Sequence, residues 1–464
     1  MNTWDLLEIV KAVNGKLLNA PEEKTKVTGL HHDSRKITKG SLFIPIVAER
    51  DGHDFLNDAI KKGAVTAFWS KSEDEAPTNF PVILVSDTEE ALKQFAAWYL
   101  KQVTPKVVGI TGSNGKTTTK DMTAAVLKTK YKTHKTAGNL NNQLGVPLTI
   151  LNMPRDTELL VVEMGMDRPG EISVLSELAQ PDVAAITMIG ESHIEAFGTR
   201  EKIAEEKLSI LAGLREDGLF IYPNDEKLLV KNERQNLRKK TFGLDKTADL
   251  FATDIIEKTR ETIFSVAQKN HTDHLKVTIP VPGSYNVQNA LIALLVGLEF
   301  DIPVQQGVDG LEQLTITENR LEWLEGKNST HLLNDAYNAS PSSVKAVLHY
   351  FSNISTAHQQ GKIIVLGDIL ELGNLSSTLH EDLEEAIDLN AYKAVFLYGS
   401  QMAFLYKKLK QNEKSEHVFH FEGEKAPLVS AIEKEMSAED MILFKASNGM
   451  DLLSVVDSLQ KETE

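Results

Sequence analysis

Short, continuous apolar runs alternate with helical spacing through the middle of the chain. The runs cover residues 107–110, 159–162, 183–187 and 218–222, with amphipathic stretches between them. A strand that is apolar on both faces is typical of a parallel sheet covered by helices on each side. The pattern therefore predicts an open α/β sheet in this region, entered through a helix over 89–100.

The same alternation returns toward the C-terminal end, and a smaller version precedes it. Apolar runs at 331–335, 362–367, 394–399 and 441–445 predict a second open, Rossmann-like sheet. Nearer the N-terminus, a strand over 41–45 and a helix over 54–62 indicate a mixed α/β unit. We therefore expect three α/β domains: a small one at 1–86, a central parallel-sheet domain at 87–314 and a Rossmann-like domain at 315–464.

Composition supports this division and excludes several functions. A chain of 464 residues corresponds to roughly three domains at about 150 residues each. The net charge of −16 argues against a protein that coats nucleic acid, which needs a basic face. Because cysteine is absent, disulfides, thiolate metal sites and a cysteine nucleophile are all excluded. With 41% hydrophobic residues, the chain is expected to be globular.

The N-terminal residues carry no sign of export or membrane insertion. They are acidic and amphipathic, without a basic segment followed by an apolar one. The longest apolar stretches, such as 290–298, are far shorter than the ~20 residues that span a bilayer. These features predict a soluble cytoplasmic protein.

The sharpest motif is Thr-Gly-Ser-Asn-Gly-Lys-Thr-Thr-Thr at 111–119, between an apolar run and a helical pattern. Glycines let successive backbone N–H groups point at phosphate oxygens, a lysine adds charge, and a threonine hydroxyl suits Mg²⁺. The standard spacing asks for glycine where Ile110 stands, so this is a variant P-loop; the alternative is a glycine-rich turn that caps a helix. The predicted nucleotide-binding residues are Gly112, Ser113, Asn114, Gly115, Lys116, Thr117 and Thr118.

Three further residues follow predicted strands or lie on predicted helices beside this loop. Glu163 ends the apolar run 159–162, where a carboxylate would face the ligand crevice and hold Mg²⁺, or would simply be solvated. His193 follows another predicted strand, and this position alone is typical of a structural histidine. Lys207 shares one helical face with four apolar residues, namely Ile203, Ile210, Leu211 and Leu214.

Lysine on an inward apolar face calls for a physical reason. Snorkelling of the ammonium to the surface is one. The other possible reason is that the amine of Lys207 is functional or chemically modified. An ammonium about 4 Å from a divalent cation would be repelled by about 8 kcal/mol at an effective dielectric constant near 20. Lys207 fits a metal site only if its charge is removed or reversed, for example as a carbamate formed with CO₂.

Three polar loops complete the set of candidate ligand-binding segments. Residues 138–147 are rich in side-chain amides, residues 334–341 join a strand to a helix, and residues 33–36 form a charged turn. Each of these is also compatible with an ordinary turn. The candidate residues in them are Asn139, Asn141, Asn142, Asp335, Asn338, Ser34 and Arg35.

Taken together, these segments resemble the Mur ligases in order and approximate spacing. The resemblance rests on 111–119, 138–147, Glu-Met-Gly at 163–165, Gly-Glu-Ser-His-Ile at 190–194 with Lys207, and Asn-Asp-Ala-Tyr-Asn-Ala-Ser-Pro at 334–341. Residues 33–43, 365–373 and 444–452 favour the family member that adds D-alanyl-D-alanine. The likeness covers nearly the whole chain.

The resemblance implies an ATP-dependent amide ligation. The first domain would bind the UDP-N-acetylmuramoyl-tripeptide, the central domain ATP, and the last domain the incoming D-alanyl-D-alanine. ATP would phosphorylate the tripeptide carboxylate to an acyl phosphate, which the dipeptide amine then attacks. The family also implies a monomer in the cytoplasm, without nucleic acid or membrane insertion.

The resemblance also implies roles for individual residues. Thr117 and Glu163 would hold one Mg²⁺, and His193 and a carbamylated Lys207 a second. Asn286 or Asn289 would contact adenine, and Arg320 and Asp335 would contact the ribose and phosphates. Departures from the family pattern occur at Tyr285, Met188, Ala446 and Asn448, where His, Asn, Gly and Arg are frequent.

Two alternative functions stay open at this stage. Another ligase of the same superfamily, adding a single amino acid or extending a folylpolyglutamate-like chain, would carry the same ATP-binding residues. A nucleotide-binding regulator on an inactive ligase fold is a different class, against which the intact Lys116, Glu163, His193 and Lys207 argue. Neither the third residue of the peptide nor the base for the incoming amine follows from the sequence.

Overall fold

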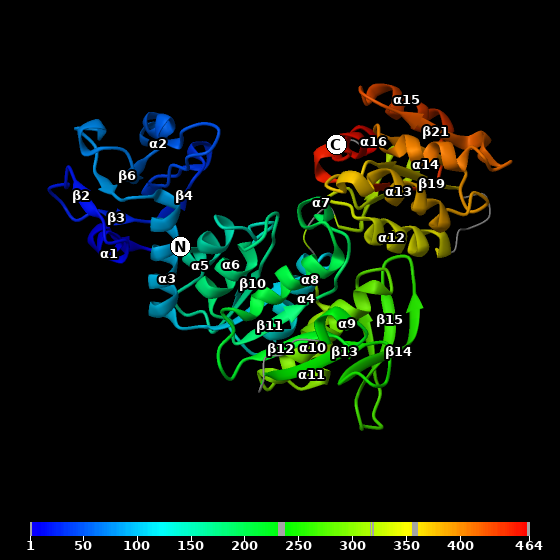
Figure 1. The fold of residues 1–464 in the computed structure, drawn as a ribbon, viewed down its shortest axis with the longest axis horizontal. Coiled ribbons are helices and arrows are strands. Elements are labelled where there is room, and N and C mark those ends of the chain that lie inside the picture. Colours follow the sequence, from blue (N-terminus) through cyan, green and yellow to red (C-terminus); the bar gives the residue numbers. More distant parts are fainter. Residues whose placement is uncertain (1, 231–236, 316, 318–319, 355–360, 462–464) are drawn as a thin grey trace.

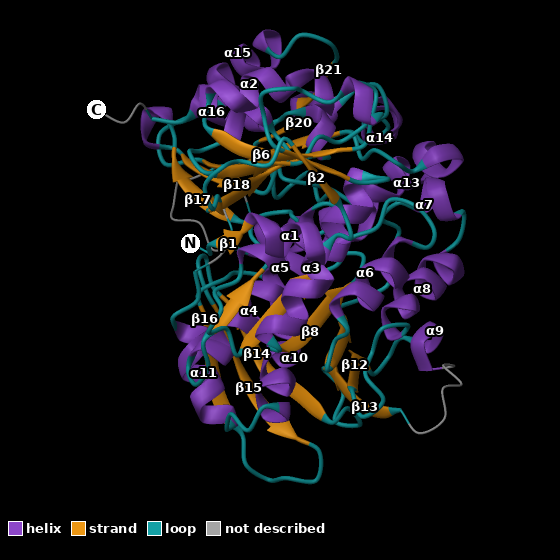
Figure 2. Cartoon of the chain, turned by 90° about the vertical axis from the view of Figure 1, so that its left-hand side faces the viewer, coloured by secondary structure: helices purple, strands orange, loops and turns teal. Residues whose placement is uncertain are grey.

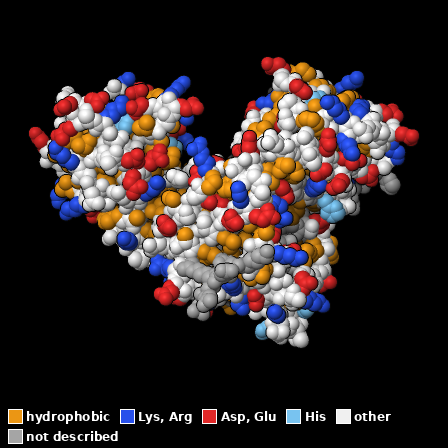
Figure 3. Space-filling model, in the orientation of Figure 1, with side chains coloured by type: hydrophobic (Ala, Val, Ile, Leu, Met, Phe, Trp, Pro, Cys, Tyr) orange, Lys and Arg blue, Asp and Glu red, His pale blue; other side chains and the backbone are white. Residues whose placement is uncertain are grey.

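The computed structural model describes residues 2–230, 237–315, 317, 320–354 and 361–461. Three main sheets follow one another along the chain, and the first and last stand on either side of the central one (Figure 1). The space-filling view shows a hollow between the first and last lobes, above the central one, with acidic and basic side chains interspersed (Figure 3).

The first sheet has five strands in the order β2-β7-β6-β5-β4, and β2 alone pairs antiparallel. Its strands are β2 (Lys16–Leu18), β4 (Gly29–His31), β5 (Ser41–Phe43), β6 (Ala64–Trp69) and β7 (Val82–Leu84). A separate two-stranded ribbon pairs β1 (Trp4–Asp5) with β3 (Lys26–Val27). The helices here are α1 (Leu6–Ala12) and α2 (Leu56–Lys61).

Helix α3 (Thr88–Val103) connects the first sheet to the central one. Asp87 caps it by accepting a hydrogen bond from the Glu90 backbone N–H at 2.7 Å. Trp4 of β1 packs edge-on against both Phe95 and Tyr99 of this helix. The Tyr99 hydroxyl donates to the Met153 carbonyl at 2.9 Å, next to helix α5 (Gly145–Asn152), which lies beside α3 (Figure 2).

The central sheet has nine strands in the order β16-β15-β14-β13-β12-β11-β8-β10-β9. Six consecutive pairings, from β9 to β14, are parallel, and β14, β15 and β16 pair antiparallel. Its strands are β8 (Lys106–Thr111), β9 (Thr133–Lys135), β10 (Leu159–Glu163), β11 (Val183–Ile186), β12 (Leu219–Pro223), β13 (Arg238–Gly243), β14 (Leu250–Glu257), β15 (Thr262–Gln268) and β16 (Leu275–Ile279).

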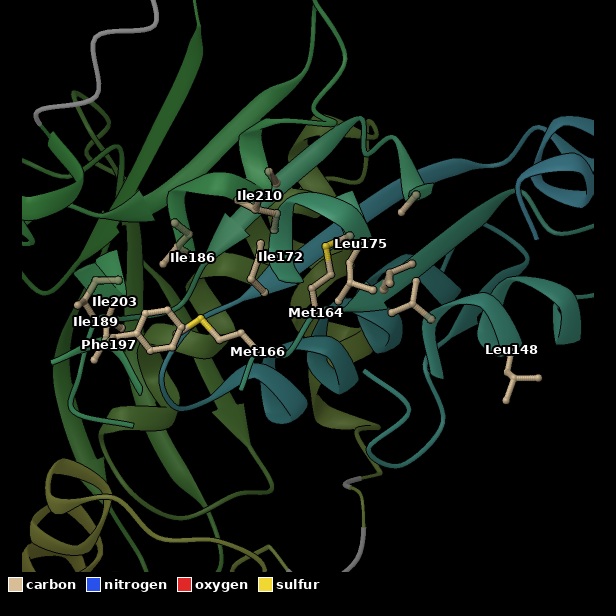
Figure 4. Close-up of a cluster of buried hydrophobic side chains, with 14 of the residues drawn as sticks. Leu148, Met164, Met166, Ile172, Leu175, Ile186, Ile189, Phe197, Ile203 and Ile210 are labelled. Carbon is tan, nitrogen blue, oxygen red and sulfur yellow. The ribbon is translucent and has the colours of Figure 1, made fainter. Parts of the chain in front are cut away.

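Helices cover both faces of the parallel part, as the doubly apolar strands require. Helix α4 (Lys116–Lys128) packs against α10 (Tyr285–Glu299) and α11 (Val304–Glu312) on one face. The other face carries a cluster that includes Met164, Ile172 and Leu175 (Figure 4). The remaining helices of this region are α6 (Glu171–Ala179), α7 (Ile194–Phe197), α8 (Arg200–Leu208) and α9 (Lys227–Val230).

The last sheet has six strands in the order β17-β18-β22-β19-β20-β21, with β17 antiparallel. Its strands are β17 (Glu322–Glu325), β18 (His331–Asn334), β19 (Lys362–Gly367), β20 (Ala394–Tyr398), β21 (Val418–Phe421) and β22 (Met441–Lys445). Its helices are α12 (Pro341–Asn353), α13 (Ser376–Glu381), α14 (Met402–Leu409), α15 (Ala426–Glu435) and α16 (Leu453–Leu459).

The predicted fold class is confirmed, since each of the three units carries mixed α/β structure. Two details differ from expectation. The antiparallel extension β14–β16 was not predicted, and the helix that carries Lys207 ends at Leu208 and tightens into a 3₁₀ turn over Ser209–Leu211. Within the described ranges, the helices are all too short or too polar to cross a bilayer.

Candidate active site

The predicted P-loop lies between the end of β8 and the start of α4, and two of its glycines are required by close packing. Gly112 has φ +151°, and a Cβ there would lie 1.8 Å from Oγ1 of Thr187. Gly115 has φ +79°, and its Cβ would lie 2.6 Å from Oδ1 of Asn289. Any side chain at these positions would displace the loop from the neighbouring strand and helix.

Lys116 folds back onto its own loop. Its Nζ donates to the carbonyls of Gly112 at 2.8 Å and Ser113 at 3.2 Å. Burial lowers the pKa of Lys116, and the nearby Glu163 carboxylate partly opposes that shift. Phosphate oxygens entering the loop would supply the negative charge that favours the ammonium.

A cavity of about 400 Å³ opens above the P-loop, between the central and last domains. That volume lies in the range of small-molecule sites. The structure brings most of the predicted nucleotide-binding residues to its wall, together with Tyr285 and Lys445. The predicted residues that line it are Ser113, Asn114, Gly115, Lys116, Thr117, Thr118, Asn286, Asn289, Arg320, Asp335 and Asn338.

Two buried asparagines of α10 tie that helix to the P-loop. Asn286 donates to the Pro282 carbonyl at 2.7 Å and accepts from Asn289 at 2.9 Å. Asn289 in turn accepts from the Thr119 hydroxyl at 3.1 Å. The pair therefore holds the loop in place from one wall of the cavity.

The opposite wall comes from the last domain and the segment that leads into it. Asp335, directly after β18, accepts from Lys445 Nζ at 2.6 Å, and Lys445 is almost fully buried. Arg320 donates to the Thr117 hydroxyl at 3.3 Å, and its guanidinium lies 4.3 Å from the ring centre of Tyr337. These contacts place a cation and a carboxylate opposite the P-loop.

Asn114 joins the P-loop directly to the last domain. Its Nδ2 donates to the hydroxyls of Ser340 at 2.9 Å and Ser342 at 3.1 Å. Ser340 is also the N-cap of α12, where its side chain accepts from the Ser343 backbone N–H. The tip of the loop and the start of this helix are therefore held together.

Glu163 is positioned as the sequence predicts, at the end of β10 and next to the P-loop. Its Oε1 accepts from the Thr117 hydroxyl at 3.2 Å and from Asn141 Nδ2 at 2.8 Å. Its Oε2 is buried and has no hydrogen-bond partner among the described residues, with Lys120 Nζ 3.8 Å away. A buried carboxylate oxygen without a donor, beside a hydroxyl, fits a divalent cation.

A cluster of buried charged residues, which the sequence pattern did not predict, lies next to Glu163. Lys120 is fully buried on α4, 3.4 Å from the carboxylate of Asp121. Asp121 also accepts from Lys135 at 2.6 Å and from both the backbone N–H and hydroxyl of Thr317. The helix that follows the P-loop is therefore bound to the segment that enters the last domain.

His193 and Lys207 come after β11, the strand that pairs with the P-loop strand β8. His193 has φ +63° and precedes α7, and its Nδ1 lies 2.5 Å from Glu371 Oε2 and 3.6 Å from Asp167 Oδ1. Lys207 is 1% exposed, and the one hydrogen bond of its Nζ among the described residues goes to the Met166 sulfur, at 3.7 Å. Burial lowers the pKa of Lys207 well below its usual value.

Five predicted substrate residues do not line the cavity, and one of them, Asn141, donates to Glu163 as described above. Asn142 accepts from the backbone N–H groups of Leu144 and Gly145 at the start of α5. Asn139 is exposed on the same loop. Ser34 and Arg35 lie in the first domain, where the Arg35 guanidinium pairs with Asp33 at 2.9 Å. Across the described ranges, no three acidic or histidine side chains lie close enough together to hold a metal ion by themselves.

Comparison with known proteins gives a consistent result over all three domains. Residues 26–99 match the model for "Mur ligase family, catalytic domain", 110–297 that for "Mur ligase middle domain", and 319–448 that for "Mur ligase, glutamate ligase domain". These matches follow the order of the three sheets.

Full-length relatives and solved structures agree with these domain matches. The UDP-N-acetylmuramoyl-tripeptide–D-alanyl-D-alanine ligase of Bacillus subtilis is 42% identical over 97% of each chain. A crystal structure of MurF from Acinetobacter baumannii has a TM-score of 0.86 at 28% identity, covering 99% of each chain. MurF from Thermotoga maritima in complex with ADP has a TM-score of 0.79 at 27% identity, covering 93% of this chain and 96% of that one. These likenesses confirm the resemblance seen in the motifs: the chain belongs to the Mur ligase family.

Proposed function

We propose that this protein joins D-alanyl-D-alanine to UDP-N-acetylmuramoyl-tripeptide with ATP, in the synthesis of peptidoglycan precursors. The observation that carries the proposal is the 42% identity, over 97% of both chains, to a relative of that name. The cavity between the P-loop and the Asp335–Lys445 pair supplies a site of suitable size for the nucleotide.

The reaction has two steps. The terminal carboxylate of the tripeptide attacks the γ-phosphorus of ATP, so that an O–P bond forms and ADP leaves. The dipeptide amine then attacks the resulting acyl phosphate, an amide C–N bond forms, phosphate leaves and the amine gives up a proton. The protein's task is chiefly to align the reactants and neutralise phosphate charge.

The residues around the cavity have distinct parts in this scheme. Lys116 would leave the carbonyls of its own loop and meet the β- and γ-phosphates. The amides of Asn286 or Asn289 would face adenine, and Arg320 and Asp335 would contact ribose and phosphate. Asn338, Asn139, Asn141, Asn142, Ser34 and Arg35 are proposed as substrate contacts.

Two magnesium ions are part of the proposal. Thr117 and Glu163 would hold one, which the unpartnered Oε2 of Glu163 supports. His193 and Lys207 would hold the second. When bound, these ions would draw charge from the transferring phosphoryl group.

Lys207 would take part as a carbamate. Its amine would attack CO₂, forming an N–C bond and releasing a proton, which requires the unprotonated amine that burial favours. In the Lys207→Ala variant, ligation should be lost and partly restored by short-chain carboxylic acids, which replace the carbamate. If the variant keeps the parent's activity, Lys207 has no such role.

Three further elements belong to the proposal. The protein would act as a monomer in the cytoplasm, where its nucleotide-linked substrate is soluble. The last domain would close on the bound substrates, since the carboxylate, ATP and dipeptide come from different domains. Small-angle scattering that is identical with and without saturating ligands would contradict the closure.

The deciding experiment follows phosphate release from ATP and Mg²⁺ with UDP-N-acetylmuramoyl-tripeptide, with and without D-alanyl-D-alanine, and records the product mass. We expect release that depends on the dipeptide and a product equal to both substrates less one water. Release only with a single amino acid would favour a sibling ligase. Nucleotide binding without release, whatever the acceptor, would indicate a regulator.

A further inference from the structure

Glu371 belongs to the segment 365–373. This segment supported the family resemblance, but no role in binding or catalysis was assigned to it. The segment begins in the last three residues of β19 of the last domain and reaches across to α7 of the central domain (Figure 1). Glu371 does not line the nucleotide cavity. Its contacts instead lead to His193, one of the residues proposed above to hold a metal ion.

Three contacts fix this segment against α7. The Glu371 carboxylate lies 2.5 Å from His193 Nδ1. The Glu371 carbonyl accepts from the Glu195 backbone N–H at 3.0 Å. Two residues later, a Cβ on Gly373 would lie 3.1 Å from Glu195 Cγ, at φ +53°, so the close approach depends on glycine. The carboxylate is thus presented to the imidazole by an anchored backbone.

This arrangement determines which imidazole nitrogen carries the proton. A carboxylate on Nδ1 keeps a proton there, which leaves the lone pair of Nε2 for a cation. Asp167 of the central domain faces the same nitrogen from 3.6 Å, beyond hydrogen-bond distance.

We propose that Glu371 is a positioning residue for His193: its carboxylate holds the imidazole with the proton on Nδ1 and thereby prepares Nε2 to bind a divalent cation. Because Glu371 belongs to the last domain and His193 to the central one, the metal ligand is prepared only when these domains adopt the arrangement seen here. The inference rests on the proposed role of His193.

The pair should matter for metal binding far more than for folding. The Glu371 side chain is 57% exposed, and exposed ion pairs contribute little to stability. Partners that orient a metal-bound histidine, by contrast, typically change metal affinity or activity by ~10–100-fold when removed. Variants at this position should therefore fold normally and remain testable.

The test uses Glu371→Ala, which removes the acceptor, and Glu371→Gln, which keeps an acceptor oxygen without the charge. Asp167→Asn is the matched control, because it alters the more distant carboxylate at the same nitrogen. Glu381→Gln alters an exposed carboxylate elsewhere in the last domain. His193→Gln identifies the resonances of His193 among the 13 histidines.

The first readout is nitrogen-15 NMR of the histidine-labelled full-length protein without metal. We expect the proton of His193 on Nδ1 in the parent, in Glu371→Gln and in both controls, and a shift toward the Nε2–H form in Glu371→Ala. The second readout is the Mg²⁺ dependence of ligation. Glu371→Ala should need ~10–100-fold more Mg²⁺ for half-maximal rate, with the KM for ATP unchanged and a smaller effect in Glu371→Gln.

Several results would overturn the proposal. Identical His193 resonances in the parent and Glu371→Ala would show that the pair does not form in solution. A changed tautomer with an unchanged Mg²⁺ dependence would deny that the pairing prepares a metal ligand. An active His193→Gln variant would remove the role of His193 on which the inference rests, whereas a parent that ligates no acceptor would refute the proposed function itself.

Discussion

Replacing Lys207 by methionine should stabilise the protein while abolishing ligation. Lys207 is 1% exposed, and within the described ranges the one hydrogen bond of its Nζ goes to the sulfur of Met166, at 3.7 Å. Methionine is similar in length, unbranched and able to fill the same space. Burial lowers the Lys207 pKa, the charge of Lys116 lowers it further, and the preceding residue, Glu206, offsets only part of this shift.

The size of the expected gain in stability follows from the lack of a strong hydrogen-bond partner for the Lys207 amine among the described residues. Burying a polar group without a compensating hydrogen bond costs about 1–3 kcal/mol in proteins, and the weak contact to sulfur recovers little of that. The free energy of unfolding should therefore rise by about 1–3 kcal/mol in Lys207→Met. For a domain of this size, the melting temperature rises by about 2–4 °C per kcal/mol.

The gain should also depend on pH with a definite sign. Since burial lowers the pKa of Lys207 in the folded state, the folded chain holds this proton less firmly than the unfolded chain does. This difference penalises folding at neutral pH and disappears as the pH rises past the ordinary lysine value of about 10.4. The advantage of Lys207→Met should accordingly be largest near pH 7 and shrink toward pH 10.

Scanning calorimetry in CO₂-free buffer measures this prediction, because a carbamate would change the charge. Since a chain of three domains need not unfold in one step, the transition that includes the central domain is compared. Lys207→Met that melts several degrees below the parent would refute the reasoning. It would mean that the Lys207 amine takes part in a stabilising interaction.

Three other substitutions test the site. Glu163→Gln should lower kcat by about 10²–10³-fold, since losing about 3–4 kcal/mol of metal-dependent stabilisation has that effect; an unchanged Mg²⁺ dependence would contradict it. Lys445→Met should raise the KM for ATP by about tenfold, or about 1.4 kcal/mol, because Asp335 loses its 2.6 Å partner; steady-state kinetics would show whether kcat changes instead. Gly112→Ala should abolish ATP binding in calorimetric titration, because the new Cβ clashes with Thr187. The control Gly170→Ala, also at positive φ but with open space around its Cβ, should bind ATP normally. Equal losses of binding in both variants would mean that the clash is unimportant.

The parts of the site that follow local pattern were predictable from sequence. The P-loop, the strand that ends in Glu163 and the inward position of Lys207 depend on runs of neighbouring residues, and the structure has all three. The antiparallel strand β15 also carries a local signal. In β15, buried and half-buried positions alternate over 262–266, a short period-two pattern, whereas β14 begins with three buried residues in a row and shows no such alternation there.

The partners of these residues could not be predicted in the same way. Glu371 and His193 are 178 positions apart, and Lys445 and Asp335 are 110 apart. Their meeting depends on how whole domains pack, which no local spacing encodes. Lys120 and Asp121 read as an ordinary charged pair on a helix, and only the packing of α4 shows that both are buried.

The position of helix α3 affects how the protein unfolds. It packs against Trp4 of the first domain through Phe95 and Tyr99, and it lies along α5 of the central domain, where the Tyr99 hydroxyl binds the Met153 carbonyl. A helix shared by two cores cannot melt in one without exposing apolar surface in the other. The first two domains therefore form one cooperative unit, and a proteolytic fragment that ends before α3 would lack part of its own core.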